Sequence, residues 1–373
     1  MITIRDRKDC CGCCACAAAC PHGAIRMEQD GMGFRYPVID KALCTDCGLC
    51  EEVCGFKKPI DTSVPAAYAI RFPDYLEGSQ SGGLGYAVMM QAIRHGMVVY
   101  GAAMDDDFVV RHRRVVALED LAPLRLSKYV QSDMDGIPAQ VFSDLKAGRK
   151  VLFTGTPCQC AGVEWICRKY RENLLLADIV CRAVPSPAFW KGYLKEKSRS
   201  GQVRRVLFRD PALGWHNNLT RIDYQDHTEY NGDYYFFCRN GLVNRPSCGQ
   251  CPYTNAHASD ITMGDCWGVE NILPGFADDD RGCSLLLIHS LAGENFTSAL
   301  EGCERRKISA GKVLAYTKKG NSPLARKVEK YYLCKGYAYV NARFGEHSLR
   351  ERFKRLLRKL NPANTKLYRR LSR

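Results

Sequence analysis

Eight cysteines near the start of the chain constrain its fold more than any other feature. They form two runs with the same C-x2-C-x2-C-x3-C spacing, which are Cys10, Cys13, Cys16 and Cys20, then Cys44, Cys47, Cys50 and Cys54. Three thiolates close together in the sequence can bind three irons of one cubane, while the fourth reaches across to another. The duplicated run therefore predicts two [4Fe–4S] clusters in one small domain.

The spacing is that of bacterial two-cluster ferredoxins, in which the fourth cysteine of each run ligates the other cluster. We therefore expect two interleaved ligand sets. They are Cys10, Cys13, Cys16 and Cys54 for cluster 1, and Cys44, Cys47, Cys50 and Cys20 for cluster 2. Pro21 follows the first run, whereas Gly55 stands where a proline is usual after the second. Cys11 and Cys14 lie outside the spacing and are expected to be bystanders.

Zinc and disulfides are the other common uses of cysteine. A structural zinc ion takes four ligands, often as two separated pairs, and a duplicated run of four does not have that form. The chain begins with the charged segment Met1 to Asp9, which lacks the apolar region of a signal peptide, and no apolar run of about 18 residues predicts a membrane span. With 21 cysteines and no export signal, we expect a reducing, cytoplasmic compartment.

The chain of 373 residues carries a formal net charge of +14. Each [4Fe–4S] cluster with four thiolates carries about −2 when oxidised, so two or three clusters would remove roughly 4 to 6 positive charges. The loaded protein stays basic, which suits an acidic donor protein such as a ferredoxin, an anionic substrate or cofactor phosphates. Nucleic acid is not expected as a partner, because no motif beyond charge indicates it.

The residues after the cysteine runs predict a mixed α/β domain. Strands and helices alternate from about Gly96 to Cys181, which indicates a sheet with some parallel pairing. Helices are expected at 84–95, 138–147, 163–170, 185–197 and 293–300, and strands at 24–27, 34–39, 97–101, 150–153, 174–181, 203–209, 219–224 and 284–288. The fold class is thus α+β or α/β, with a ferredoxin-like N-terminal domain.

We divide the chain into five parts. They are a ferredoxin domain at 1–56, a linker at 57–74, the N-terminal part (75–150) and the C-terminal part (151–342) of the α/β domain, and a basic tail at 343–373. The tail places apolar residues on one helical face and arginine and lysine on the other, the apolar ones being Leu349, Phe353, Leu356, Leu357 and Leu360. We expect a terminal helix that docks on the core, or alternatively one that contacts an anionic membrane surface or a partner.

Four further cysteines lie where turns are expected. Cys158 and Cys181 follow predicted strands, and Cys248 and Cys251 form a C-x2-C pair. Because turns at strand ends can bring thiols to one point, we predict a third [4Fe–4S] cluster here, with zinc or a redox-active pair as the alternatives. The cysteines expected to be small core residues are Cys160, Cys167, Cys238, Cys283, Cys303 and Cys334. Cys266 could substitute in any such site.

Six short motifs follow one another in the α/β domain. They are Ser81-Gly82-Gly83, Ser127 to Ser132, Gly155 to Gln159, Val184 to Pro187, Arg245 to Cys248 and Ser259 to Thr262. In this order they resemble the coenzyme F420 hydrogenase/dehydrogenase beta-subunit family, with a ferredoxin domain fused at the N-terminus. The resemblance covers about residues 1–320.

The resemblance implies an FAD site in the α/β domain and electron transfer between iron–sulfur clusters and that flavin. The residues carried over for FAD are Ser81, Gly82, Gly83, Lys128, Tyr129, Gln131, Gly155, Thr156 and Asp260. It also implies that the third cluster lies close to the flavin. Independently of the resemblance, the glycine-rich turn at 78–83 suits a phosphate, because a turn that opens a helix presents free N–H groups, although a plain loop has the same residues.

The chain departs from the family pattern where substrate chemistry would take place. Arg182 and Ala183 stand where a His-Gly pair is usual, and Cys266 stands where the Gly-Asp-x-Trp-Gly segment usually has an aromatic residue. Lys128 and Arg182 are the candidates for stabilising an anionic flavin or a substrate phosphate. A surface lysine in a polar turn is the alternative for Lys128.

These features predict an iron–sulfur flavoprotein oxidoreductase that moves electrons between ferredoxin-type clusters and FAD and reduces or oxidises a small molecule. One alternative is a dehydrogenase of reduced coenzyme F420. The other is a non-catalytic electron-transfer subunit that serves a partner enzyme, with the basic tail as its docking surface.

Overall fold

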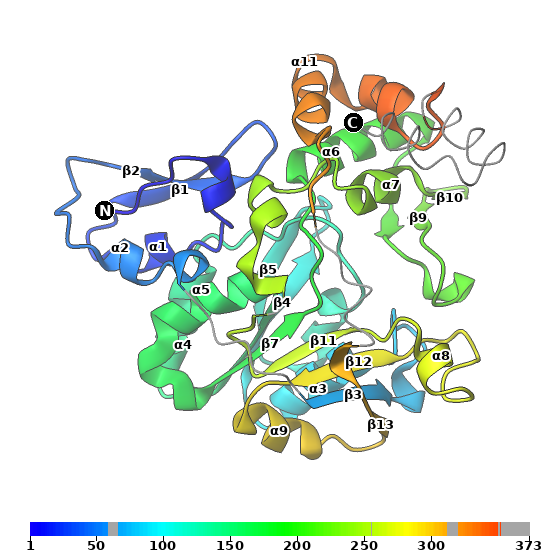
Figure 1. The fold of residues 1–373 in the computed structure, drawn as a ribbon, viewed down its shortest axis with the longest axis horizontal. Helices are drawn as coiled ribbons and strands as arrows, with labels where there is room; N and C mark the ends of the chain where they lie inside the picture. Colours follow the sequence, from blue (N-terminus) through cyan, green and yellow to red (C-terminus); the bar gives the residue numbers. More distant parts are fainter. Residues whose placement is uncertain (59–65, 255, 312–319, 350, 352–373) are drawn as a thin grey trace.

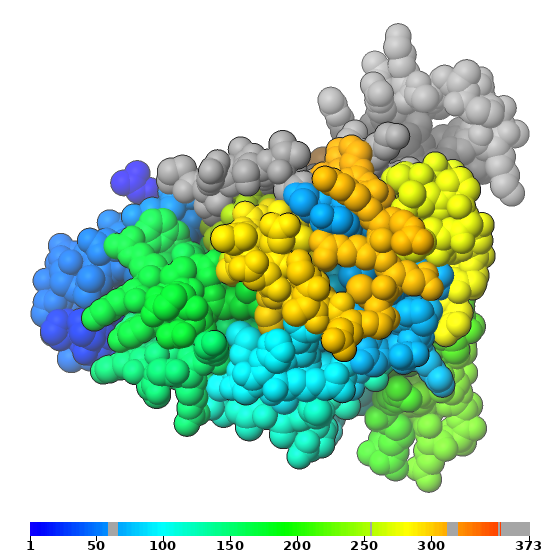
Figure 2. All heavy atoms as spheres, turned by 90° about the horizontal axis from the view of Figure 1, so that it is seen from below, coloured from blue at the N-terminus to red at the C-terminus, as the bar shows by residue number. Residues whose placement is uncertain are grey.

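The structure is a computed structural model that describes residues 1–58, 66–254, 256–311, 320–349 and 351. Its centre is an eight-stranded mixed sheet with the order β13-β3-β12-β11-β7-β6-β4-β5 (Figure 1). The strands are β3 (Ala66–Arg71), β4 (Val98–Met104), β5 (Val110–Val115), β6 (Val151–Gly155), β7 (Leu174–Ile179), β11 (Ile261–Asp265), β12 (Ser284–Ile288) and β13 (Glu304–Ile308). Segments far apart in the sequence thus build one sheet, and Figure 2 shows blue residues of the β3 region beside orange residues of the β13 region.

The four central strands β11, β7, β6 and β4 run parallel to one another, and β12 and β5 flank them in the antiparallel direction. β7 reads LLLADI and its first five residues are buried. Such a continuous apolar strand forms where both faces of a parallel sheet are covered.

Helices cover the two faces of the sheet. On one face, α3 (Leu84–Arg94) and α9 (Leu291–Ser298) pack with the odd-numbered β7 residues Leu175 and Ala177. On the other face, α4 (Ile137–Lys146) and α5 (Pro157–Cys167) pack with the even-numbered Leu174 and Leu176. This alternation follows from the two-residue period of a strand.

The N-terminal domain consists of a hairpin and two short helices. They are β1 (Ile25–Gln29), β2 (Arg35–Ile39), α1 (Ala15–Ala18) and α2 (Leu49–Glu52). Its apolar residues Ile2, Ile25 and Met27 belong to the same core cluster as Val141 of α4 and Val163 of α5. The domain therefore docks on the α4–α5 face of the sheet (Figure 1).

A second layer with an aromatic core lies beside the end of the sheet. It consists of β8 (Arg205–Leu207), β9 (Thr220–Asp223), β10 (Thr228–Asn231), α6 (Pro187–Lys197), α7 (Asp233–Arg239) and the long α11 (Ala325–Phe344). Trp190 of α6 packs against Tyr234 of α7 with a centroid distance of 4.9 Å, and Tyr193 packs against Tyr337 of α11 at 5.6 Å. The short α8 (Val269–Ile272) follows β11.

Most predicted elements are confirmed, including the hairpin in the ferredoxin domain and the strand at 284–288. Three differences matter. The segment 57–74, predicted as a linker, contains strand β3, which lies between β13 and β12. α5 begins at Pro157, earlier than predicted, because Gln159 Oε1 accepts the Thr156 N–H and caps the helix. α11 and β13 were not predicted, and the apolar tail residues beyond 351 lie outside the described residues.

Within the described ranges, no helix combines the length and the apolar composition that a membrane span requires.

Gly82 offers a stability test of the packing that positions α3. A Cβ at Gly82 would lie 2.4 Å from the Ile70 carbonyl oxygen and 2.5 Å from the Ser284 nitrogen, whereas one at Gly85 would meet nothing within 4 Å. We expect Gly82→Ala to lower the free energy of unfolding by about 1–3 kcal/mol through overpacking. The matched control Gly85→Ala, inside α3, should raise it by up to about 1 kcal/mol through helix propensity.

Anaerobic chemical denaturation followed by circular dichroism measures both variants. Equal midpoints for Gly82→Ala and the wild type would contradict the close approach of Gly82 to β3 and β12.

Candidate iron–sulfur and flavin sites

One edge of the large sheet gathers the loops that carry most of the predicted site residues. β3, β4, β6, β7 and β11 all run in the same direction, because β12 is antiparallel to both β3 and β11. Their carboxyl ends therefore share one edge, which is where ligands bind in open α/β sheets. We call this the carboxyl edge.

The four cysteines predicted for the third cluster line one pocket. Cys158 comes from the first turn of α5, Cys181 from the loop after β7, and Cys248 and Cys251 from the segment after Arg245. Burial raises the pKa of Cys248 to about 12. A thiol must lose its proton to bind iron, so a cluster bound at this pocket would require the release of these protons.

The cysteines predicted for cluster 2 line a second pocket. Cys20, Cys44, Cys47 and Cys50 meet there together with the apolar Ile25 and Ile39. Cys47 is exposed, whereas Cys50 is buried. Cluster 2 would thus lie at the outer surface of the ferredoxin domain, where a donor protein can approach.

The four cysteines predicted for cluster 1 lie near one another inside the ferredoxin domain. Burial raises the pKa of Cys16, and the negative charges of Cys13, Cys10 and Cys54 raise it further. Burial is the main reason why the pKa of Cys54 is raised to about 11, and the negative charges of Cys13 and Cys10 add to it. The four cysteines predicted for cluster 1 are therefore neighbours in the structure, and Cys54 of the second run is one of them.

Within the described ranges, no three His, Cys, Asp or Glu side chains are grouped so that they could share one metal ion. A cubane differs from a single ion because each of its thiolates binds a separate iron. We therefore consider the three cysteine sets as ligands of clusters.

Cys11, expected to be a bystander, contacts cysteines of two predicted ligand sets. Hydrogen bonds with Cys13 and Cys158, together with burial, raise its pKa well above the usual range. Cys11 also lines the pocket of the third set. Cys11 thus contacts both Cys13, predicted for cluster 1, and Cys158, predicted for the third cluster. Cys14, in contrast, is 2% exposed and belongs to the apolar core.

The other cysteines are only partly as expected, since Cys238 and Cys303 are half-buried and Cys266, considered a spare ligand, lies in a core cluster. Cys160 and Cys167 are fully buried on α5, and Cys266 is fully buried beside Cys283 in a separate core cluster. Cys334, predicted as a core residue, is exposed instead. Gly55, which replaces the usual proline, packs so close to α5 that a Cβ there would lie 2.8 Å from Trp165.

Arg245 connects the ferredoxin domain to the third cysteine set. It is 1% exposed. Its Nε donates to the Cys10 carbonyl at 2.8 Å, Nη1 to Gln131 Oε1 at 2.9 Å and Nη2 to the Arg35 carbonyl at 2.7 Å. Gln131 in turn donates to the Cys11 carbonyl at 3.0 Å. Sequence analysis noted Arg245 only as part of a motif, and nothing in the spacing revealed these contacts.

The residues predicted for FAD are only partly brought together. Ser81 to Gly83 lie between β3 and α3 at the carboxyl edge, and Gly155, the last residue of β6, and Thr156 lie at the same edge. The glycines have structural reasons for being there, because Gly82 lies against the backbone of β3 and β12 and Gly83 has a φ of +86°. Thr156 Oγ1 donates to Gln159 Oε1 at 3.0 Å.

Lys128 is the residue that best fits an anionic cofactor. Its Nζ donates to the Arg125 carbonyl at 2.7 Å, and burial lowers its pKa to about 7. An enclosed ammonium with three donors favours a negatively charged neighbour. Beyond its bond to the Arg125 carbonyl, the ammonium could also donate to a flavin phosphate or an anionic flavin ring.

Two residues of the predicted FAD set face other partners. Gln131 is occupied by Arg245 and the Cys11 carbonyl. The Asp260 carboxylate accepts from Arg171 at 2.8 Å, the Leu176 N–H at 2.8 Å and the Ser290 hydroxyl. Asp260 precedes β11, so it lies away from the carboxyl edge, and all these contacts are within the chain.

An aromatic and charged group at the carboxyl edge was missed by sequence analysis. Trp215 and Trp267 stack with a centroid distance of 4.8 Å and an interplanar angle of 4°, and Arg209 lies 5.1 Å from the Trp267 centroid. Arg209 donates to Asp265 at 2.9 Å and also contacts Tyr129. The Gly-Asp-x-Trp-Gly segment, which contains Trp267, could have indicated this group. Trp215 and Arg209 lie in a segment without a recognisable motif.

Comparisons with known proteins agree with the predicted family. Residues 148–322 match the C-terminal region of the family described as "Coenzyme F420 hydrogenase/dehydrogenase, beta subunit", and residues 9–58 match the 4Fe-4S dicluster domain. This part of the chain is therefore similar to the beta-subunit family, and it follows a segment similar to dicluster domains. The matches indicate an iron–sulfur protein related to oxidoreductases.

Two individual proteins are similar to parts of this chain. One subunit of the Na(+)-translocating ferredoxin:NAD(+) oxidoreductase complex of Acetobacterium woodii is 41% identical over 64 residues, which is 17% of this chain and 17% of that protein. The chain thus matches about a sixth of the length of that relative. A chain of the F420-reducing [NiFe] hydrogenase complex from Methanosarcina barkeri is 16% identical, with a TM-score of 0.49 over 77% of this chain and 94% of that chain.

The third ligand set can be tested by removing one of its thiols. We expect Cys158→Ala to lower the iron content of anaerobically purified protein from about twelve to about eight per chain, because a cubane needs four ligands. Because Cys11 lies beside Cys158 and could replace it, the double variant Cys11→Ala/Cys158→Ala is measured in parallel. Cys334→Ala, which removes an exposed thiol, is the control. Unchanged iron in the double variant would exclude Cys158 as a ligand.

Proposed function

We propose that the chain is an iron–sulfur flavoprotein oxidoreductase that moves electrons between a ferredoxin-type donor and a small molecule. The observation that carries this proposal is the spatial order of the three cysteine sets, from the surface of the ferredoxin domain to the carboxyl edge. The set for cluster 2 includes the exposed Cys47, that for cluster 1 lies inside the ferredoxin domain, and Cys11 connects it to the third set at the carboxyl edge. The arrangement leads from the surface to the edge where a flavin would bind.

Bound clusters would supply one-electron carriers, and bound FAD a carrier that pairs two electrons for a hydride. The residues of the chain have separate tasks in this scheme. Twelve cysteine thiolates hold the clusters. Lys128 offers positive charge to an anionic part of the flavin, and the exposed Arg182, on the rim of the third cysteine pocket, offers it to substrate.

The balance of electrons sets the stoichiometry. Two donor proteins are each oxidised by one electron, and the small molecule gains two electrons and one proton as a hydride equivalent. The reverse direction uses the same residues. We keep coenzyme F420 as the candidate substrate that the family description favours.

A non-catalytic electron-transfer subunit is the second candidate. The matched family consists of beta subunits, and the relative in Acetobacterium woodii is one component of a larger complex. In that case the carboxyl edge would deliver electrons to a partner protein instead of a small molecule.

An anaerobic turnover experiment distinguishes the two candidates. The holoprotein, reconstituted with FAD, is mixed with chemically reduced ferredoxin, and flavin absorbance is followed with and without oxidised coenzyme F420. Reduction of F420 at a rate that depends on ferredoxin supports the enzyme. Cluster reduction without flavin bleaching in the presence of bound FAD overturns it, and flavin bleaching without F420 turnover leaves the subunit as the better account.

The Lys128 assignment predicts a pH dependence of flavin affinity. Free Lys128, with a pKa of about 7, is charged below that pH and neutral above it. An anionic flavin raises this pKa on binding, so affinity should be constant below pH 7 and fall as the pH rises above it. Lys128→Met should weaken binding by about tenfold near pH 6 and remove the pH dependence.

Flavin fluorescence titrations across the pH range measure this effect. Lys146→Met, at an exposed position in the last turn of α4, serves as the control and should bind as the wild type does. If Lys128→Met keeps both the affinity and its pH dependence, Lys128 does not face the flavin.

A further inference from the structure

Arg245 is a buried cation with no acidic side chain beside it. Among the described residues, it hydrogen-bonds two backbone carbonyls, one amide oxygen and the Cys10 thiol, and it forms no ion pair with an aspartate or glutamate. Burying an ionised group without a countercharge is costly. The groups near it that can carry negative charge are the thiols of Cys10, Cys11 and Cys248 and the Tyr36 hydroxyl.

The position of the guanidinium is closely determined. A Cβ at Gly12 would lie 2.7 Å from its Nη1, so the glycine between Cys11 and Cys13 makes room for it. The ring centroids of Tyr36 and Phe34 lie 4.4 Å and 5.3 Å from its Cζ. The guanidinium is therefore fixed between the loop of cluster 1 and the segment of the third set.

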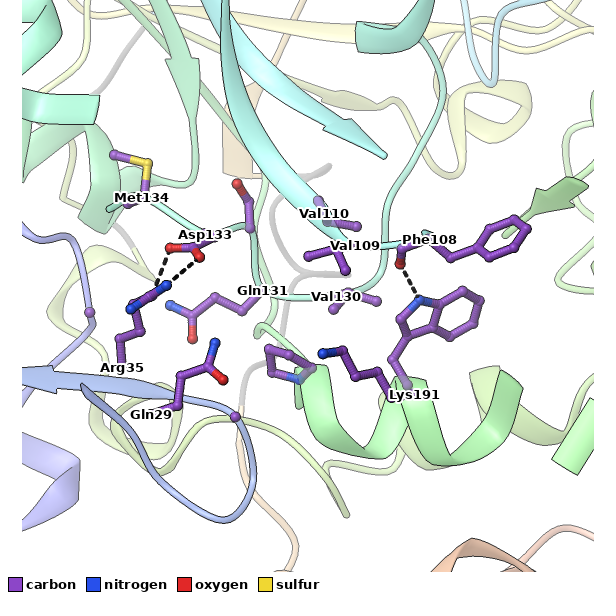
Figure 3. A pocket seen from close by; sticks show the side chains of 15 residues that line it. Gln29, Arg35, Phe108, Val109, Val110, Val130, Gln131, Asp133, Met134 and Lys191 are labelled. Carbon is purple, nitrogen blue, oxygen red and sulfur yellow. Dashed lines mark hydrogen bonds and ion pairs between the residues drawn. The ribbon is translucent and has the colours of Figure 1, made fainter. Parts of the chain in front are cut away.

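Gln131 holds this group from the other side. Figure 3 shows Gln131 in the pocket at the seam between the domains, near Gln29, and the ion pair between Arg35 and Asp133 close by. Gln131 contributes hydrogen bonds but no charge. Arg245 and Gln131 thus separate two functions, charge and geometry, that can be tested one at a time.

We propose that Arg245 is a positioning residue for electron transfer, whose permanent charge favours the reduced, more negative state of cluster 1 and of the third cluster over that of cluster 2. This inference rests on the ligand sets of the proposed function. The guanidinium lies between the first and third sets, whereas the set for cluster 2 is at the outer surface and includes the exposed Cys47. An electron that enters at cluster 2 would then move to cluster 1 and the third cluster, because their reduction potentials are higher.

The test is a redox titration of the holoprotein followed by electron paramagnetic resonance. In Arg245→Gln, which keeps donor groups but not the charge, we expect the ratio of reduced to oxidised cluster 1 at a fixed solution potential to fall at least tenfold, which corresponds to about 59 mV for a one-electron couple. The third cluster should shift in the same direction and cluster 2 by much less. Cys158→Ala identifies the signal of the third cluster.

Two further variants distinguish charge from geometry. Gln131→Met removes the hydrogen bonds and Arg245→Lys keeps the charge, so both should leave the ratio within threefold of the wild type. Equal potentials in Arg245→Gln and the wild type, an equal shift of cluster 2, or the full shift in Gln131→Met would overturn the inference.

The iron content separates failure of this inference from failure of the proposed function. About twelve irons per chain in the wild type with no shift in Arg245→Gln rejects only the role of Arg245. If Arg245→Gln does not retain its iron, Arg245→Lys decides. A ratio of reduced to oxidised cluster 1 within threefold of the wild type supports the role of the charge, and a ratio that falls tenfold or more contradicts it.

Discussion

The contact of the Arg245 guanidinium with the ferredoxin domain is the interaction on which the arrangement of the cysteine sets depends. One side chain reaches the carbonyls of Cys10 and Arg35 from the segment that carries Cys248. The shared core of Ile25, Met27 and Val141 holds the same two domains together by apolar contact. These contacts place the third cysteine set beside the first, which is the arrangement on which the proposed electron route depends.

Much of the architecture could be predicted because its signals are local. The spacing of eight cysteines predicts interleaved ligand sets, and the structure groups Cys20 with the second run accordingly. The apolar run at 284–288 predicts a buried strand, which is β12. Cys158 and Cys181 were placed correctly at strand ends, because parallel strands direct their following turns to one edge.

The remaining features depend on contacts between distant segments. β3 lies in a segment rich in proline and alanine whose strand character depends on pairing with β12 and β13. Cys11 lies outside the ferredoxin spacing, and only the docking of the domains brings it to Cys158. Asp260 was carried over from a motif, but a motif does not show that it precedes its strand and pairs with Arg171. Sequence reasoning thus anticipated which cysteines lie together better than it anticipated the surroundings of the residues assigned to the flavin.

The most direct test of the account is the content of iron, acid-labile sulfide and flavin in anaerobically purified protein, read together with its absorbance spectrum. Three clusters that lead to a flavin predict about twelve irons, about twelve sulfides and one FAD per chain. About eight irons with FAD would remove the third cluster from the account. Full iron with no flavin, even after FAD is added back, would contradict the flavoenzyme and leave an electron-transfer subunit.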